Sequence, residues 1–291
     1  MKKCLPIMFI SFIFASFFCF KFSSVQDLNK DKPNSSYESF GKSGIYSSDL
    51  DKIDEESYLM DSPVKTAYES EKAKEVFLTF DDGPCNNNTK KILNILKDNN
   101  IKATFFIIGT KGEENPQILK ELSDNGMSVG VHTYSHKYNE IYKNTDSYFK
   151  DYYNCQRVIR RITGRDPAPY LRMPGGSDNL VASKKILDNI KNILRQKDLK
   201  YVDWNVSSGD AESCKVSVEK IKKNVIDQCK NKKIAVILMH DTYYKNTTVE
   251  ALPYIVKTLK DEGFIFKTFD DITQNEETQM VKMRVINRIS I

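Results

Sequence analysis

From residue 75 to residue 270 the chain alternates short apolar runs with amphipathic stretches. This alternation is typical of parallel strands joined by helices. The amphipathic stretches repeat with a helical period, as where Ile92, Leu93 and Leu96 would share one helix face. The predicted strands cover residues 76–80, 104–108, 127–131, 169–171, 201–206, 234–239 and 264–268.

Breaks and capping signals set the expected helix ends. Asn115 is expected to cap a helix that begins at Pro116 and ends before Gly126. Thr247 and Glu250 match the capping box of the last helix in the pattern. Further helices are expected at about residues 148–162, 181–196 and 215–228.

Seven or so strand–helix units favour a closed or nearly closed α/β barrel, in which active-site groups lie at the carboxyl ends of the strands. An open doubly wound parallel sheet is the alternative. The length of 291 residues fits one catalytic domain with additional segments. We assign the catalytic domain to residues 75–270 and a C-terminal tail to residues 271–291.

A continuous apolar run follows Lys2 and Lys3 and stops at Lys21. It is longer than the usual core of a signal peptide and barely long enough to span a bilayer. The preceding positive charges and the lack of a small-residue cleavage site before Ser23 favour an uncleaved anchor over a removed signal. We therefore predict a membrane anchor or signal segment over residues 1–23.

Residues 24–74 are polar and lack sustained periodicity, which predicts a flexible linker. The protein is thus expected outside the cytoplasm, held at the cell membrane by its N-terminal segment or secreted if that segment is cleaved. Cys214 and Cys229 are not expected to form a disulfide there, because the helix predicted between them would hold them about 22 Å apart.

The balance of charged residues limits the kinds of binding partner that we expect. Lys and Arg number 44 against 39 Asp and Glu, so the net charge of +5 is spread over a large surface. No dense basic stripe is present in the sequence, so nucleic acid is not an expected partner. Nothing in the sequence implies a protein partner.

Each of the three histidines lies close behind a predicted strand, and two aspartates and one arginine share this placement. A barrel would gather such positions on one rim. Histidines that only packed or faced solvent would have no reason to share strand ends. The six residues are Asp81, Asp82, His132, His136, Arg172 and His240.

The spacing of His132 and His136 lets one helical turn or a tight loop aim both imidazoles at one metal ion. One carboxylate would complete a two-His, one-Asp site, which suits zinc and leaves positions open for water and substrate. Either Asp81 or Asp82 can supply that carboxylate, and a bound dication would leave the other free as a base. Taken alone, the Asp-Asp-Gly-Pro run is an ordinary turn sequence.

Four short motifs lie at these strand ends: TFDDGP at 79–84, HTYSH at 132–136, RMPGG at 172–176 and LMHD at 238–241. In order and spacing they resemble the signature motifs of the polysaccharide deacetylases, carbohydrate esterase family four. The resemblance extends over about residues 75 to 270. It implies a distorted (β/α) barrel of the NodB type with about seven parallel strands, and a hydrolase acting on non-peptide carbon–nitrogen bonds.

The resemblance also implies roles. Asp81 is similar to the general base of the family and His240 to its general acid. Asp82, His132 and His136 are similar to the ligands of one divalent metal ion, with zinc expected and cobalt or another divalent ion as alternatives. The chemistry agrees, because amide hydrolysis needs an activated water, a stabilised oxyanion and a proton for the departing amine.

Two more residues would support these groups. The resemblance implies that Arg172 orients Asp81, which a guanidinium can do because its planar fork grips a carboxylate. Asp210, in the run VSSGDA, resembles the aspartate that would pair with His240 and keep that imidazole protonated.

The chain departs from the usual family pattern in two motifs. Many members place Trp directly after the aspartate, whereas this chain has Ala211 after Asp210 and carries its only tryptophan at Trp204. Gly175 stands where an aromatic residue often follows the proline, which removes a side-chain contact but keeps a backbone N–H for the oxyanion. Leu238 is expected to line a pocket for the acetyl methyl group, with a place in the core as the alternative.

A tethered and exported deacetylase can reach the wall close to its own membrane. N-acetylglucosamine of peptidoglycan is therefore the expected substrate. Chitin-type oligosaccharide, an exopolysaccharide or O-acetylated xylan are alternatives, because one metal, base and acid serve all these acyl groups. A catalytically inactive wall-binding protein is the alternative of another class; it would predict a missing ligand or base, and none is missing from the sequence.

Overall fold

The structure is a computed structural model in which residues 73–287 are described. The predicted anchor at residues 1–23 lies outside the described residues, and so does almost all of the predicted linker. Within 73–287, no helix is both long enough and apolar enough to cross a bilayer.

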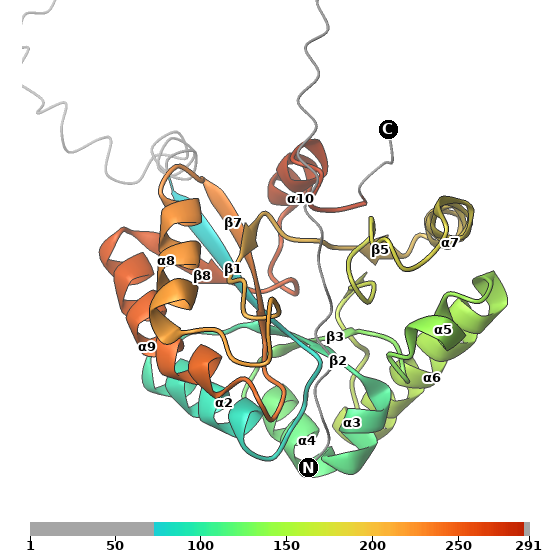
Figure 1. Cartoon of the computed structure of the whole chain (residues 1–291), viewed down its shortest axis with the longest axis horizontal. Coiled ribbons are helices and arrows are strands. Elements are labelled where there is room, and N and C mark those ends of the chain that lie inside the picture. Colours follow the sequence, from blue (N-terminus) through green and yellow to red (C-terminus); the bar gives the residue numbers. More distant parts are fainter. Residues whose placement is uncertain (1–72, 288–291) are drawn as a thin grey trace, which may run out of the picture. The chain divides into compact units, whose positions relative to one another are not determined.

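Eight strands form one sheet in which all paired strands run parallel. The order is β5-β4-β3-β2-β1-β7-β6, and β8 pairs with the first half of β1. Figure 1 shows β1 and β7 side by side, as their register requires. The strands are β1 (Lys74–Asp81), β2 (Thr104–Ile107), β3 (Ser128–Val131), β4 (Tyr170–Leu171), β5 (Lys200–Tyr201), β6 (Val206–Ser207), β7 (Ile234–His240) and β8 (Phe264–Lys267).

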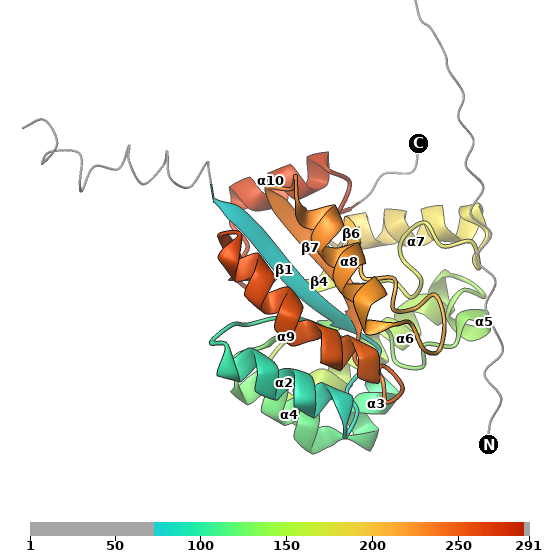
Figure 2. The same cartoon turned by 60° about the vertical axis from the view of Figure 1, so that its left-hand side comes forward.

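Helices follow most of the strands and lie outside them (Figures 1 and 2). Cys214 and Cys229 precede and end α8 and are both free thiols, as expected. The helices are α2 (Asn88–Asp98), α3 (Gly109–Glu114), α4 (Pro116–Asp124), α5 (Tyr138–Ile141), α6 (Thr145–Thr163), α7 (Lys184–Gln196), α8 (Val218–Cys229), α9 (Asn246–Asp261) and α10 (Gln274–Lys282).

The two ends of the sheet path, β5 and β6, both come from the single predicted strand 201–206. The N–H of Val202 donates to the carbonyl of Leu171 at 2.9 Å, whereas the N–H of Asn205 donates to the carbonyl of Val236 at 3.2 Å. The chain therefore crosses from the β4 side to the β7 side between these residues. The prediction of one strand was wrong, but the predicted distorted (β/α) barrel is confirmed in preference to an open doubly wound sheet.

Alternate side chains of β1 enter two different environments. Val76, Leu78 and Phe80 pack in the larger core cluster, between the sheet and the helices. Phe77 belongs to the smaller cluster, which fills the barrel interior. Asp81 falls on this inner row at the carboxyl end of the strand. The inward-facing row of β1 thus runs from Phe77 through Thr79 to Asp81 and becomes polar toward the carboxyl end of the strand.

Part of the predicted C-terminal tail packs on the barrel. Helix α10 begins with a capping box, in which Thr273 accepts from the N–H of Glu276 and Glu276 accepts from the N–H of Thr273. Met280 and Ile286 are buried in the inner cluster. Ile286 also forms an antiparallel bridge with Val202, beside the crossing between β5 and β6.

The predicted helix from Pro116 and its N-cap position at Asn115 are confirmed, whereas the capping box predicted at Thr247 and Glu250 was wrong. Asn115 stands at the N-cap position of α4, but its side chain accepts no capping bond. It donates instead to the carbonyls of Pro84 and Lys111, at 3.1 Å each, and so ties α4 to the loop after β1. Thr247 and Glu250 lie inside α9, because this helix already begins at the residue before Thr247.

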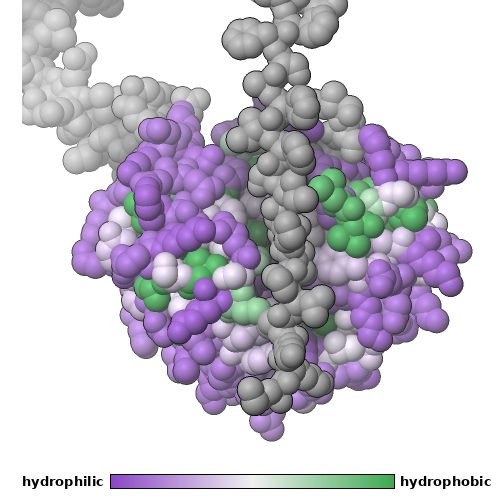
Figure 3. Space-filling model, in the orientation of Figure 1, coloured by the Kyte–Doolittle hydropathy of each residue, from purple (hydrophilic) through white to green (hydrophobic). Residues whose placement is uncertain are grey.

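The visible surface of the described residues is mainly hydrophilic, with separate hydrophobic patches (Figure 3). Among the described residues, the large apolar side chain with the highest exposure is Leu180, in the loop between β4 and α7. The next residue, Val181, is also exposed.

Candidate active site

The loops after β1 and β3 bring Asp82, His132 and His136 together. Nε2 of each histidine lies 3.3 Å from Oδ1 of Asp82. The three ligand atoms lie within 4.8 Å of one another. Asp82 Oδ1 is buried, and no described residue gives it a well-formed hydrogen bond. Two imidazoles and one unpartnered carboxylate oxygen fit a divalent metal ion.

Unusual backbone angles aim these side chains at one point. Asp82, Thr133 and His136 have positive φ values of 75°, 65° and 53°. Such angles cost energy in residues other than glycine and are typical of functional loops. The two histidines are therefore presented by a tight loop rather than by a helical turn.

A second contact fixes the ring of His132. Its Nδ1 lies 2.8 Å from the carbonyl oxygen of Arg172. A proton on Nδ1 would donate to this carbonyl and leave the lone pair of Nε2 facing Asp82. Metal-binding histidines are commonly oriented in this way.

Electrostatics favour an ionised Asp82. Burial raises the pKa of Asp82, but the close approach of His132 and the charges of His136 and His240 outweigh it and hold that pKa well below its usual range. A carboxylate in this state is an acceptor only, as a metal ligand must be.

Arg172 is fully buried and holds Asp81. One of its terminal nitrogens lies 3.0 Å from Asp81 Oδ1 and donates to Thr79 Oγ1 at 2.7 Å. Its other N–H groups donate to the carbonyls of Val202 and Asp203. A surface position for Arg172 is therefore excluded. With all its donors directed inward, the guanidinium has little freedom to move.

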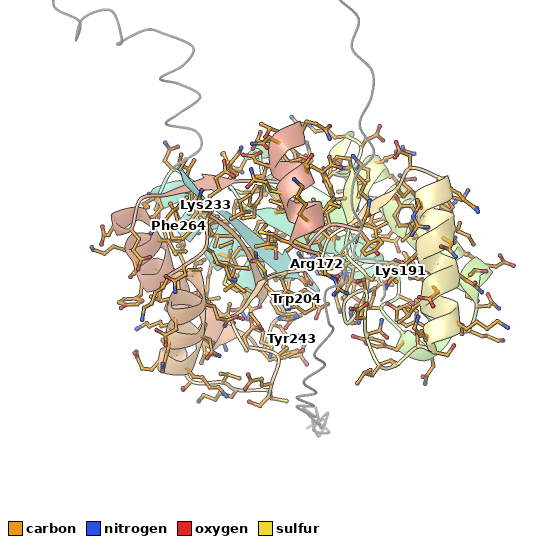
Figure 4. All side chains as sticks on the ribbon, turned by 90° about the horizontal axis from the view of Figure 1, so that it is seen from above. Arg172, Lys191, Trp204, Lys233, Tyr243 and Phe264 are labelled. Atoms are coloured by element: carbon orange, nitrogen blue, oxygen red, sulfur yellow. The ribbon has the colours of Figure 1, made fainter. Side chains whose placement is uncertain are left out.

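Aromatic rings complete the surroundings of Arg172. Its guanidinium carbon lies 4.4 Å from the ring centre of Phe106 and 5.7 Å from that of Trp204. Figure 4 labels Arg172 and Trp204 at the middle of the fold. Trp204 also lies close to Gly176, where a Cβ atom would come within 3.0 Å of the indole. The only tryptophan thus packs beside the arginine.

Partly buried His240 and buried Asp210 form a pair on the other side of the site. Nδ1 of His240 lies 2.7 Å from Asp210 Oδ1, and the other carboxylate oxygen accepts from the His240 N–H and from Thr248 at 2.8 Å each. Burial lowers the pKa of His240, but the charge of Asp210 outweighs this effect and raises it to about 9. The imidazole is therefore protonated at neutral pH.

Leu238 lies on the strand that carries His240, and Gly175 lies beside Tyr138. Leu238 is nearly buried and precedes His240 by two residues in β7, so both side chains leave the same face of the strand. Gly175 has a positive φ of 77°, and a Cβ atom there would lie 3.2 Å from the ring and hydroxyl of Tyr138. Tyr138 thus occupies space beside Gly175 that a larger side chain would need.

Tyr138 is one of two site residues that sequence reasoning missed. Its ring meets that of His136 edge-on, with centroids 5.1 Å apart. Burial first, and then the charges of Asp82 and Asp81, raise the pKa of Tyr138 to about 12. Its phenol therefore stays protonated. An aromatic residue two positions after a predicted ligand was the available signal.

Asp241 is the other missed residue. It is buried, accepts a 2.6 Å bond from Thr89, and donates its N–H to the Asp81 carbonyl. A Cβ atom on Gly83 would lie 2.2 Å from its carboxylate. Burial, followed by the nearby charge of Asp82, raises the pKa of Asp241 to about 7. Asp241 braces the loop that carries Asp82, and its place in the LMHD run was the available signal.

Comparison with known proteins identifies the family. A family model described as polysaccharide deacetylase matches residues 68–202. A peptidoglycan-N-acetylglucosamine deacetylase of Bacillus cereus is 32% identical over 220 residues, which cover 73% of this chain and 75% of the relative. A peptidoglycan-N-acetylmuramic acid deacetylase of Bacillus subtilis is 30% identical over 214 residues, covering 72% and 75%.

Comparison with solved structures gives the same family. The catalytic domain of a peptidoglycan N-acetylglucosamine deacetylase from Eubacterium rectale is 34% identical and superposes with a TM-score of 0.63, over 69% of this chain and 89% of that one. A family-four carbohydrate esterase from Streptococcus mutans is 29% identical with a TM-score of 0.61, over 70% and 90%. By sequence, fold and site, this chain belongs to the polysaccharide deacetylases, hydrolases that act on carbon–nitrogen bonds.

Proposed function

We propose that this protein hydrolyses the N-acetyl group of N-acetylglucosamine in peptidoglycan and that it needs a divalent metal ion, zinc being the natural candidate. The observation that carries the proposal is the convergence of Asp81, His240 and the Asp82–His132–His136 cluster on one rim of the barrel. The substrate rests on the printed activities of the relatives from Bacillus cereus and Eubacterium rectale.

The residues divide the reaction between them. A metal ion held by Asp82, His132 and His136 would supply a Lewis acid at the acetamide and the attacking water. Asp81, fixed by Arg172, accepts the proton of that water.

Collapse of the tetrahedral adduct releases an amine, which must gain a proton to leave. His240 is the donor, because Asp210 keeps its imidazole protonated and oriented. By the family resemblance, the backbone N–H of Gly175 would donate to the developing oxyanion, and Leu238 would line the pocket for the acetyl methyl group. Products are acetate and a glucosamine unit of the glycan.

We also propose that the protein works outside the cytoplasm, held to the membrane by residues 1–23. The support is the apolar run behind two lysines in the sequence. Cell fractionation of the full-length chain against one starting at residue 24 tests this. Loss of membrane association in the shorter chain is expected, and equal membrane association of both would contradict the anchor.

Acetate release tests the enzymatic proposal. Full-length protein is incubated with purified peptidoglycan, N-acetylglucosamine oligomers and acetylated xylan, with zinc or with a chelator. We expect metal-dependent release from peptidoglycan that Asp81→Asn abolishes. Asp98→Asn, which changes an exposed aspartate at the end of α2, is the matched control and should keep full activity.

Other outcomes separate the alternatives. Release from xylan or free oligomers alone would reassign the substrate. Loss of acetyl from muramic acid instead of glucosamine would assign the activity printed for the Bacillus subtilis relative. No release from any substrate, with tight binding to the wall, would support an inactive wall-binding protein.

A further inference from the structure

The hydroxyl of Tyr138 lies between the candidate metal cluster and the loop that carries Gly175. The Tyr138 ring meets that of His136 edge-on, with centroids 5.1 Å apart. A Cβ atom on Gly175 would lie 3.2 Å from the Tyr138 hydroxyl oxygen, so this oxygen lies beside the Gly175 backbone. Tyr138 thus extends from a ligand of the cluster to the residue whose N–H the proposed mechanism assigns to the oxyanion.

The Tyr138 hydroxyl has no hydrogen-bond partner within residues 73–287, in contrast to the hydroxyls of two neighbouring tyrosines. The Tyr134 hydroxyl donates to Glu113 at 2.8 Å, and the Tyr142 hydroxyl donates to the Pro174 carbonyl at 2.8 Å. Tyr138 is partly exposed, so a substrate can reach it. Because a phenol carries one O–H donor, this donor remains for a ligand that enters the site.

The surroundings hold the hydroxyl and the Gly175 loop in place. Tyr138 is the first residue of helix α5, and its ring centroid lies 6.1 Å from that of Tyr142. The N–H of Gly176 donates to the Met173 carbonyl at 2.8 Å and closes a turn around Gly175. Donors that are fixed before the reaction stabilise developing charge without having to reorganise.

We propose that the Tyr138 hydroxyl is a catalytic group, which donates a hydrogen bond to the oxyanion beside the N–H of Gly175. The inference rests on the proposed function and deepens it. As water attacks the acetyl carbon, a C–O bond forms and the π electrons of the carbonyl move onto its oxygen. Tyr138 keeps its proton throughout and shares it with that oxygen. When the electron pair returns, the C–N bond breaks and the amine takes a proton from His240.

This contact strengthens as charge develops on the oxygen, so it should lower the barrier more than it tightens binding of the substrate. Tyr138→Phe removes the hydroxyl and keeps the ring beside His136. With full-length metal-loaded protein and soluble glycan strands of peptidoglycan, we expect kcat to fall about 100-fold while KM changes less than about twofold. Tyr254→Phe, which removes a hydroxyl from a half-exposed tyrosine of α9, should leave both constants unchanged.

Two measurements separate this role from a structural one. Elemental analysis should find equal metal content in Tyr138→Phe and the unmodified protein. The loss of kcat should also shrink below about tenfold on strands that carry N-trifluoroacetyl groups, because fluorine withdraws charge from the oxyanion and reduces its need for a donor. Unchanged kcat, a loss of metal that accounts for the lost activity, or an equal loss on both acyl groups would overturn the proposal.

Acetate binding gives a readout apart from turnover, because a carboxylate oxygen of acetate can accept the same hydrogen bond. Calorimetry with metal-loaded protein should show acetate affinity about tenfold lower in Tyr138→Phe and unchanged in Tyr254→Phe. Equal acetate binding by Tyr138→Phe and the unmodified protein, including none by either, would overturn the role of the hydroxyl. Absence of deacetylation by the unmodified protein would instead refute the proposed function, and the acetate titration would still decide whether Tyr138 contacts a bound acyl oxygen.

Discussion

Asp81 and His240 are register partners at the carboxyl ends of the neighbouring parallel strands β1 and β7. The proposed base and acid are therefore spaced by the sheet itself, with the N–H of Asp241 donating to the carbonyl of Asp81 just beyond the pair. Groups on rigid strands hold catalytic geometry better than groups on free loops. This pairing would place the base that takes a proton from water next to the acid that delivers one to the leaving amine.

The alkaline limit of activity should follow His240. Its raised pKa, about 9, means that the acid form is present below that pH and is lost as the pH rises through it. Asp210→Asn removes the charge that raises this pKa, so the alkaline fall in kcat should move down toward the ordinary histidine value of about 6.5. Profiles of kcat against pH for both proteins check this, and coinciding alkaline limbs would contradict the role of Asp210.

Arg172→Lys should impair turnover more than folding. A lysine keeps the buried charge beside Asp81 but cannot reproduce the donors to Thr79, Val202 and Asp203. We expect kcat to fall about 100-fold, the cost of misplacing a catalytic group by about 1 Å. Steady-state kinetics measure this, with Arg157→Lys on the exposed side of α6 as the control. A near-normal kcat in Arg172→Lys would show that the guanidinium group is not needed to position Asp81.

His136→Ala should abolish stable metal binding. The variant keeps only two of the three ligands, Asp82 and His132, and Asp82 is already partly exposed. Dialysis followed by elemental analysis should find about one zinc per unmodified chain and almost none per variant chain. Equal metal content in the two would place the metal elsewhere.

Gly83→Ala should destabilise the loop that carries Asp82. The added methyl would lie 2.2 Å from the carboxylate of Asp241, which is buried and held by Thr89. Relieving this steric clash requires movement of a packed side chain, which should lower the free energy of unfolding by about 1–3 kcal/mol. Urea unfolding measures this cost. Gly164→Ala is a suitable comparison, because only the positive φ opposes a methyl group there, with no atom within 4 Å.

Much of the fold could be predicted because buried parallel strands read as apolar runs. The prediction of one strand at 201–206 was wrong, because hydrophobic periodicity does not show that the two ends of this run pair with different strands. Asn115 has the sequence features of a cap, yet the carbonyls of Pro84 and Lys111 attract its side chain. Hydrogen-bond acceptors that only the folded protein brings near a side chain cannot be recognised from the local sequence.

The candidate site was predictable where its residues share strand ends, and this holds for Asp81, Asp82 and His240. Tyr138 was missed because its relation to Gly175 depends on the path of two separate loops.

The most direct test of the proposed function counts both products on one sample of peptidoglycan. Acetate and newly formed glucosamine amine are measured together after treatment with metal-loaded protein. Hydrolysis of the N-acetyl group predicts one amine for each acetate, with neither product when a chelator is present or when Asp81 is changed to Asn. Acetate without new amine would show cleavage of an ester instead, and would contradict the N-deacetylase assignment.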